Sequence, residues 1–149
     1  MAKAEATEGL SKAERDAVKQ RAKEVREQQK AGKNREAGEA AVKDAIAALE
    51  PDDRSLAEGF YATVSEVAPQ LVPKTYYGMP GFANAAGKMV VFMQPAKKFN
   101  TRYATIGFED TAQLDDGDLW PVGFGVRAWT PAVDQAVRER VQRAVGHAG

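Results

Sequence analysis

Cysteine is absent from this 149-residue chain, and histidine occurs once, as His147 close to the C-terminal end. The absence of cysteine excludes disulfides, thiolate metal sites and a cysteine nucleophile. A single terminal histidine argues against histidine zinc sites, serine–histidine triads and histidine acid–base catalysis. The chain also lacks a Gly-Lys-Ser or Gly-Lys-Thr phosphate loop and a Gly-x-Ser-x-Gly elbow. These absences favour a non-enzymatic role, leaving open only an enzyme that uses tyrosine, lysine or carboxylate groups.

Net charge and long apolar runs are lacking as well. Lysine plus arginine and aspartate plus glutamate each number 21, so no overall electrostatic attraction toward nucleic acid or a membrane surface is expected. No window approaches the roughly 18 apolar residues that a membrane span needs, and residues 1–6 include an acidic side chain where a signal peptide would be apolar. We therefore expect a cytoplasmic protein whose partners are neither membranes nor nucleic acid.

Aromatic side chains are missing from the first 50 residues, and the composition changes near Pro51. Ser11 and Glu14 have the spacing of a capping box, which predicts a helix over residues 11–31. Its apolar residues recur at helical spacing but are small, so little surface is available for burial. We expect residues 1–35 to form a charged helical extension, through which a homodimer is one expected assembly.

Residues 36–149 are expected to form one α+β domain. Apolar residues at helical spacing predict helices over residues 36–49 and from about 53 to 68. Thr130 and Pro131 are strong helix-start residues and predict a last helix ending near Val145. Between these helices the pattern predicts short strands near Phe82 and over residues 88–94, 101–108 and 120–126. Helices followed by antiparallel strands and a final helix predict a small antiparallel sheet packed on one face by helices.

Residues 76–82 combine aromatic rings, two glycines and a proline, which suits an irregular segment of fixed shape. A short basic turn with interleaved aromatic residues follows it by about 15 residues, and could hold a phosphate or stack a base. The candidate ligand-binding residues in the two segments are Tyr76, Tyr77, Met79, Phe82, Lys97, Lys98, Phe99 and Arg102. The alternative is that these rings close the core and the basic turn is simply solvated.

An acidic loop at residues 109–118 is the candidate metal site. Clustered carboxylates suit hard cations such as calcium, magnesium or iron. The candidate ligands are Glu109, Asp110, Asp115, Asp116 and Asp118. Gly117 stands in the wrong register for a calcium helix–loop–helix loop, and a solvated turn is the alternative.

Part of this pattern resembles the YdhG-like family of bacterial domains of unknown function, over roughly residues 49–145. The matching motifs are Ala68-Pro69, Pro73-Lys74-Thr75, Tyr77-Gly78-Met79-Pro80, Gly87-Lys88 and Lys97-Lys98. Some members are described as intracellular iron chaperones with a frataxin-like α+β arrangement. The resemblance therefore implies an α+β fold and adds iron as a candidate cargo.

Two functions follow as expectations. The first is non-enzymatic binding of a small molecule or protein partner around residues 76–82, without a cofactor. The second is binding of iron or another hard cation through the acidic loop, in the manner of an iron chaperone.

Overall fold

The computed structural model describes residues 10–31 and 35–146, so His147 lies outside the described residues. Within them the chain forms four helices and a five-stranded antiparallel sheet, which confirms the α+β class. The elements in chain order are α2 (Lys12–Ala31), α3 (Arg35–Ala47), α4 (Pro51–Val67), β1 (Val72–Tyr76), β2 (Met79–Ala83), β3 (Met89–Gln94), β4 (Ala104–Phe108), β5 (Gly123–Val126) and α5 (Pro131–Ala144). None of the described helices is long and apolar enough to cross a membrane.

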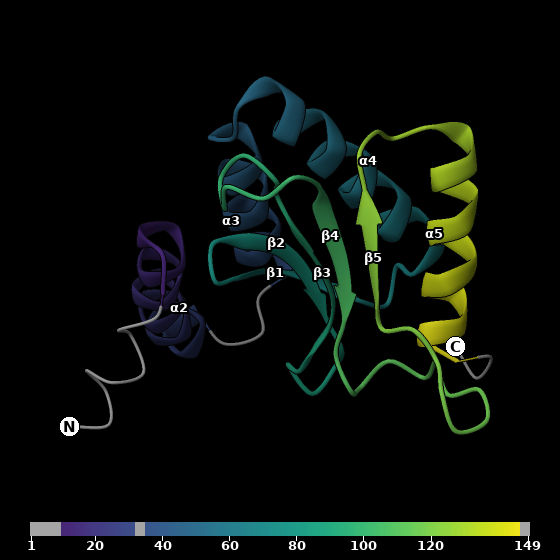
Figure 1. The fold of residues 1–149 in the computed structure, drawn as a ribbon. Coiled ribbons are helices and arrows are strands. Elements are labelled where there is room, and N and C mark those ends of the chain that lie inside the picture. The colour runs from purple at the N-terminus through teal and green to yellow at the C-terminus, as the bar shows by residue number, and fades with distance from the viewer. Residues whose placement is uncertain (1–9, 32–34, 147–149) are drawn as a thin grey trace.

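The sheet is a meander in which each strand pairs with the next along the chain, in the order β1-β2-β3-β4-β5. Helices α3 and α4 cover one face, and α5 stands beside β5 and packs on α4 (Figure 1). The core lies between these helices and the sheet, where Phe60 of α4 meets Phe82 of β2 edge-on with ring centroids 5.7 Å apart. The predicted packing of helices on one sheet face is therefore confirmed.

Three of the helices begin where the sequence places start signals. The Ser11 hydroxyl accepts from the Glu14 amide, and the Glu14 carboxylate accepts from the Ser11 amide, both at 3.1 Å. Pro51 occupies the first turn of α4, and the Thr130 side chain caps α5 by accepting from the Val133 amide. These local signals are sufficient to predict where the helices begin, because capping involves only residues within one turn of each other.

Strand β1 was not predicted, and two of the predicted strands are shorter in the structure. β1 contains Pro73, which is tolerated because β1 is an edge strand and needs no second hydrogen-bonded neighbour. The strand predicted over residues 101–108 begins only at Ala104, because the Thr101 hydroxyl donates to the carbonyls of Ala96 and Tyr103 and closes a loop there. Likewise, β5 covers only the second half of residues 120–126.

Helix α3 lies unusually close to β1. A Cβ atom added to Gly38 would stand 2.1 Å from the carbonyl oxygen of Pro73, so any larger side chain would push the helix away. On the same helix the buried Val42 and Ile46 belong to the core on the β1 side. The close packing of α3 on β1 positions the edge of the sheet that carries the Tyr76–Tyr77 pair.

Candidate functional site

The segment at residues 76–82 is a β-hairpin rather than an irregular loop. Tyr76 pairs with Met79, and the two residues between them form the turn. Both turn residues have positive φ, 53° at Tyr77 and 78° at Gly78, which matches the type I′ turn that joins twisted antiparallel strands. Glycine adopts this conformation freely, whereas a tyrosine there is uncommon.

The two tyrosine rings form an aromatic cluster at the hairpin tip. Tyr76 and Tyr77 meet edge-on at 4.8 Å, and Tyr76 also contacts Phe92 at 5.2 Å. The Tyr76 hydroxyl donates to Glu109 at 3.2 Å. Burial, and then the neighbouring Glu109 carboxylate, raise the pKa of Tyr76 to about 12. The Tyr76 phenol is therefore neutral at physiological pH and serves as a hydrogen-bond donor.

Helix α2 is docked on this hairpin tip. The buried Glu24 carboxylate accepts from the Gly78 amide at 3.0 Å, and the side chains of Arg21 and Gln28 donate to the Thr75 carbonyl. The Arg21 guanidinium also lies over both tyrosine rings, 5.1 and 5.8 Å from their centroids. The hairpin tip predicted as a ligand site is thus occupied by the protein's own helix.

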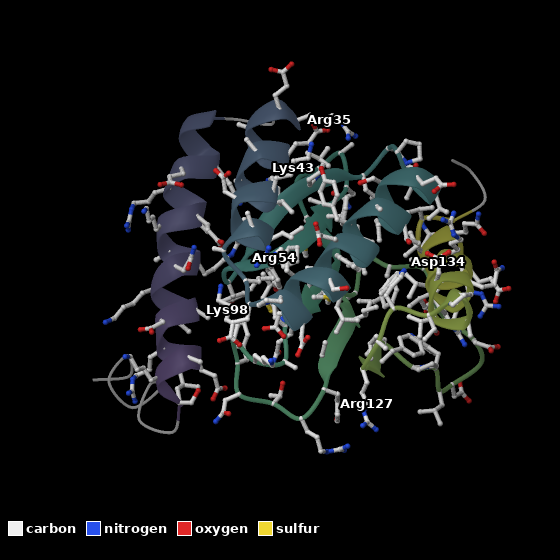
Figure 2. All side chains as sticks on the ribbon, turned by 90° about the horizontal axis from the view of Figure 1, so that it is seen from above. Arg35, Lys43, Arg54, Lys98, Arg127 and Asp134 are labelled. Carbon is white, nitrogen blue, oxygen red and sulfur yellow. The ribbon has the colours of Figure 1, made fainter. Side chains whose placement is uncertain are left out.

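Lys98 completes the polar cluster under α2. Its ammonium group donates to the Gly78 carbonyl at 3.0 Å, and Figure 2 places Lys98 on the side of the domain that faces α2. Desolvation lowers the pKa of Lys98, against the opposing attraction of Glu24. Lys98 also lies 5.9 Å from the ring centroid of the half-buried Phe99. Lys98 therefore ties the β3–β4 loop to the hairpin tip, and it lines a cavity of about 400 Å³ against the first turns of α2.

Met79 and Phe82 are core residues. Met79 is 6% exposed and Phe82 is 1% exposed. Phe82 packs between Phe60 and the tilted ring of Tyr61. The expectation that Met79 and Phe82 line a groove is corrected, because β2 is buried on both of its faces and neither side chain reaches an opening.

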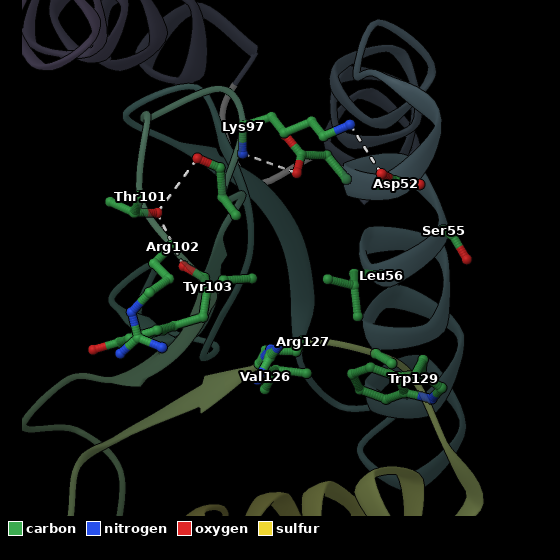
Figure 3. A pocket seen from close by; sticks show the side chains of 14 residues that line it. Asp52, Ser55, Leu56, Lys97, Thr101, Arg102, Tyr103, Val126, Arg127 and Trp129 are labelled. Carbon is green, nitrogen blue, oxygen red and sulfur yellow. Dashed lines mark hydrogen bonds and ion pairs between the residues drawn. The ribbon is translucent and has the colours of Figure 1, made fainter.

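A groove of about 580 Å³ lies on the other side of the loop between β3 and β4 (Figure 3). Its walls come from the first turns of α4, the β3–β4 loop and the segment between β5 and α5. The residues that line it are Asp52, Asp53, Ser55, Leu56, Ala96, Lys97, Thr101, Arg102, Tyr103, Ala104, Val126, Arg127, Ala128 and Trp129. Lys97 and Arg102 were predicted as ligand-binding residues, and the structure places both here.

Asp53 holds the β3–β4 loop against α4. Its side chain is 2% exposed, and its two oxygens accept from the backbone amides of Lys97 and Lys98 at 3.1 and 3.0 Å. The Lys97 side chain then points back and pairs with Asp52 at 2.9 Å. This hydrogen bond, together with the charge of Asp52, raises the pKa of Lys97. The predicted cluster is therefore divided, because Lys97 faces the groove and Lys98 faces α2.

Two guanidinium groups give the groove its unpaired positive charge. Arg102 lies over the ring of Tyr103 with 4.9 Å to the centroid, and Arg127 projects from the end of β5 (Figures 2 and 3). Among the residues that the structure describes, neither Arg102 nor Arg127 has a carboxylate partner. The walls of the groove therefore offer two positive charges to an incoming anion.

Trp129 forms the apolar end of the groove. Its indole covers Gly59 of α4 so closely that a Cβ there would stand 2.5 Å from the ring, and its N–H donates to Asp134 at 3.2 Å. Leu56 and Val126 contribute apolar side chains beside it. Sequence analysis missed Arg127 and Trp129, because no local motif marks them and only folding brings them to the basic turn.

The acidic loop does not gather its carboxylates. Glu109 is engaged by Tyr76, and the other candidate ligands, Asp110, Asp115, Asp116 and Asp118, are exposed. Across residues 10–31 and 35–146, no three acidic or histidine side chains form a group that could hold a metal ion. Leu114 is 2% exposed and anchors the loop to the core. Cation binding here stays a prediction without support from the geometry.

Comparison with protein-family models, curated proteins and solved structures finds no match for this chain.

Proposed function

We propose that this protein is a non-enzymatic binding domain that holds a small organic anion in the groove between α4, the β3–β4 loop and the β5–α5 segment. The observation that carries the proposal is the pair of guanidinium groups, Arg102 and Arg127, at the rim of one groove without carboxylate partners among the described residues. Guanidinium groups bind carboxylates and phosphates through paired charge-assisted hydrogen bonds. A ligand that brings this charge would complete the site.

The shape of the groove favours a ligand with a flat apolar part. Its volume of about 580 Å³ falls within the range typical of small-molecule sites. Trp129 and Tyr103 contribute aromatic surface, while Leu56 adds an aliphatic contact. An aryl phosphate or aryl carboxylate would place its ring against these groups and its charge toward the arginines.

The Asp52–Lys97 ion pair sets the strength of the site. Lys97 would add a third positive charge, but Asp52 holds its ammonium group at 2.9 Å. Both side chains are solvent-exposed, so the pair is screened by salt and readily rearranged. An anion entering the groove competes with Asp52 for Lys97, and removal of the Asp52 charge would favour the anion.

Titration with phenyl phosphate, with inorganic phosphate as comparator, tests this function. Trp129 fluorescence reports binding once Trp120 has been replaced by phenylalanine. Arg102→Gln and Arg127→Gln are each expected to weaken phenyl phosphate binding about tenfold, the size expected for loss of a hydrogen bond to a charged group. Asp52→Asn is expected to strengthen it severalfold.

The test is decisive because the arginine variants should lower the affinity for phenyl phosphate and the Asp52 variant should raise it. Arg143→Gln, which removes an exposed arginine of α5 outside the groove, serves as the matched control and should leave phenyl phosphate binding unchanged. Equal affinity in the native protein and the Arg102 and Arg127 variants would refute the proposed site. Weaker binding in Asp52→Asn would refute the competition between Asp52 and the ligand.

The remaining expectations stay hypotheses beside this proposal. We propose that the protein acts in the cytoplasm, which its lack of cysteine suits. Membership of the YdhG-like family rests on the sequence motifs alone, and iron binding by the acidic loop rests on composition. Dimerisation through α2 would compete with the intramolecular docking of α2 on the hairpin. Light scattering of the protein would detect a dimer.

A further inference from the structure

A second cavity, separate from the groove, lies between α5 and the β4–β5 edge of the sheet. Its volume is about 220 Å³, and its lining is almost entirely apolar, with Ile106, Phe124, Val133 and Val137 among its residues. In Figure 1 α5 stands beside β5, the last strand of the meander, where no further strand covers the core. This cavity shares only Val126 with the groove.

Arg140 is the one charged residue that lines this cavity. It follows Val133 by seven residues and Val137 by three, so a helical period places it on the same face of α5 as these apolar side chains. Its guanidinium lies 5.3 Å from the ring centroid of Phe124. Among the described residues it has no carboxylate partner. A cation at the mouth of an apolar cavity matches an apolar molecule that ends in an anion.

We infer that this cavity binds a small amphiphilic carboxylate, with its apolar body between α5 and β5 and its carboxylate on Arg140. Planar guanidinium groups pair with carboxylates through two parallel hydrogen bonds, which favours a terminal carboxylate. The size limit follows from volume. Since an apolar protein cavity of about 150 Å³ accommodates benzene, a cavity of 220 Å³ has room for a chain of about six carbons or a ring with a short tail.

The apolar part of the ligand explains why the site would differ from the groove. The groove has two arginines and an ion pair at its rim, and so selects for charge. The cavity at α5 has one guanidinium, and so binds its ligand mainly by removing apolar surface from water. A strongly hydrated ion such as inorganic phosphate should therefore bind poorly there.

Hexanoate is the probe, with hexanol and hexylamine as matched neutral and cationic comparators. Titrations followed by amide chemical shifts in NMR are expected to move signals of residues 133–140 and of β5, with hexanoate binding more tightly than hexanol and hexylamine weakest. Arg140→Gln is expected to weaken the binding of hexanoate about tenfold while leaving the affinity for hexanol unchanged. Ala136→Phe, an exposed position of α5 at the cavity, should weaken hexanoate and hexanol alike by filling the space.

Arg127→Gln is the control for the site, since it should weaken the binding of phenyl phosphate in the groove and leave the affinity for hexanoate at α5 unchanged. Well-dispersed spectra of each variant establish that it is folded. Equal affinity for hexanoate and hexylamine, an unchanged hexanoate affinity in Arg140→Gln, or shifts confined to the groove would each overturn the inference.

Discussion

The positive φ at Tyr77 leads to a prediction about which small residue best replaces it. At ordinary backbone positions alanine is more stable than glycine by about 0.5–1 kcal/mol, because glycine loses more conformational freedom on folding. At a left-handed position the order reverses, since a side chain there costs about 1–2 kcal/mol. Tyr77 has φ 53°, so Tyr77→Gly should be more stable than Tyr77→Ala by about 0.5–1 kcal/mol, the difference between these two effects.

Both variants lose the same ring contacts, so the comparison isolates the backbone. The Tyr77 ring meets Tyr76 edge-on, which is worth about 0.5–1.5 kcal/mol, and lies under Arg21, which is worth about 0.5–1 kcal/mol. Tyr77→Ala should therefore lose about 1–2.5 kcal/mol relative to the native protein, and Tyr77→Gly should regain part of that loss.

Urea denaturation of the two variants under identical conditions measures the difference. Ala41, on the exposed side of α3, supplies the matched control, because Ala41→Gly in a helix should cost about 1 kcal/mol. If Tyr77→Ala proved at least as stable as Tyr77→Gly, the type I′ turn and the argument built on it would be wrong.

Three further predictions test the packing, the electrostatics and the α2 contact. Gly38→Ala should lower the melting temperature, because overlap with the Pro73 carbonyl, at about 1–3 kcal/mol, outweighs the roughly 1 kcal/mol gain in helix propensity; an unchanged melting temperature would contradict this. The hydrogen bond from Arg138 is the main cause that lowers the pKa of Asp134 to about 2. The ionised Asp134 carboxylate therefore stabilises the folded state fully above the pKa of about 4 that it has in the unfolded chain, and this stabilisation is lost as the pH falls toward 2. Urea midpoints of Asp134→Asn across that window should fall less steeply with acid than those of the native protein, and parallel curves would refute the assignment. Glu24→Ala should speed tryptic cleavage within α2 while the melting temperature changes little, whereas equal cleavage would show that this contact does not hold the helix.

Much of the helical framework is encoded locally and was predictable. The capping residues at Ser11 and Thr130 act within one turn, and the spacing of Leu56, Phe60 and Val64 marks the face of α4 that is buried. These signals depend on neighbours a few residues away, so they survive without knowledge of the rest of the fold. The strands over residues 88–94 and 101–108 were also predictable in place, although not in their bounds.

The hairpin was missed because its turn contradicts the usual residue preferences. Two-residue hairpin turns favour Asn-Gly or Asp-Gly, and Tyr77 takes the first position here. Pro73 and Pro80, one in each flanking strand, also argue against a sheet. The structure accommodates them because β1 is an edge strand and the register between β2 and β3 extends only from Gly81 to Ala83.

The sequence by itself determined the class of this protein, the starts of its helices and the chemistry it lacks, because composition, capping and periodicity are properties of short segments. Only the tertiary structure decided which of the predicted site residues face an opening. Asp53 turns Lys97 toward the groove and Lys98 toward α2, although the two are adjacent. The groove is lined by this loop together with Arg127 and Trp129, which lie more than 20 residues away in the sequence, and only folding brings them side by side.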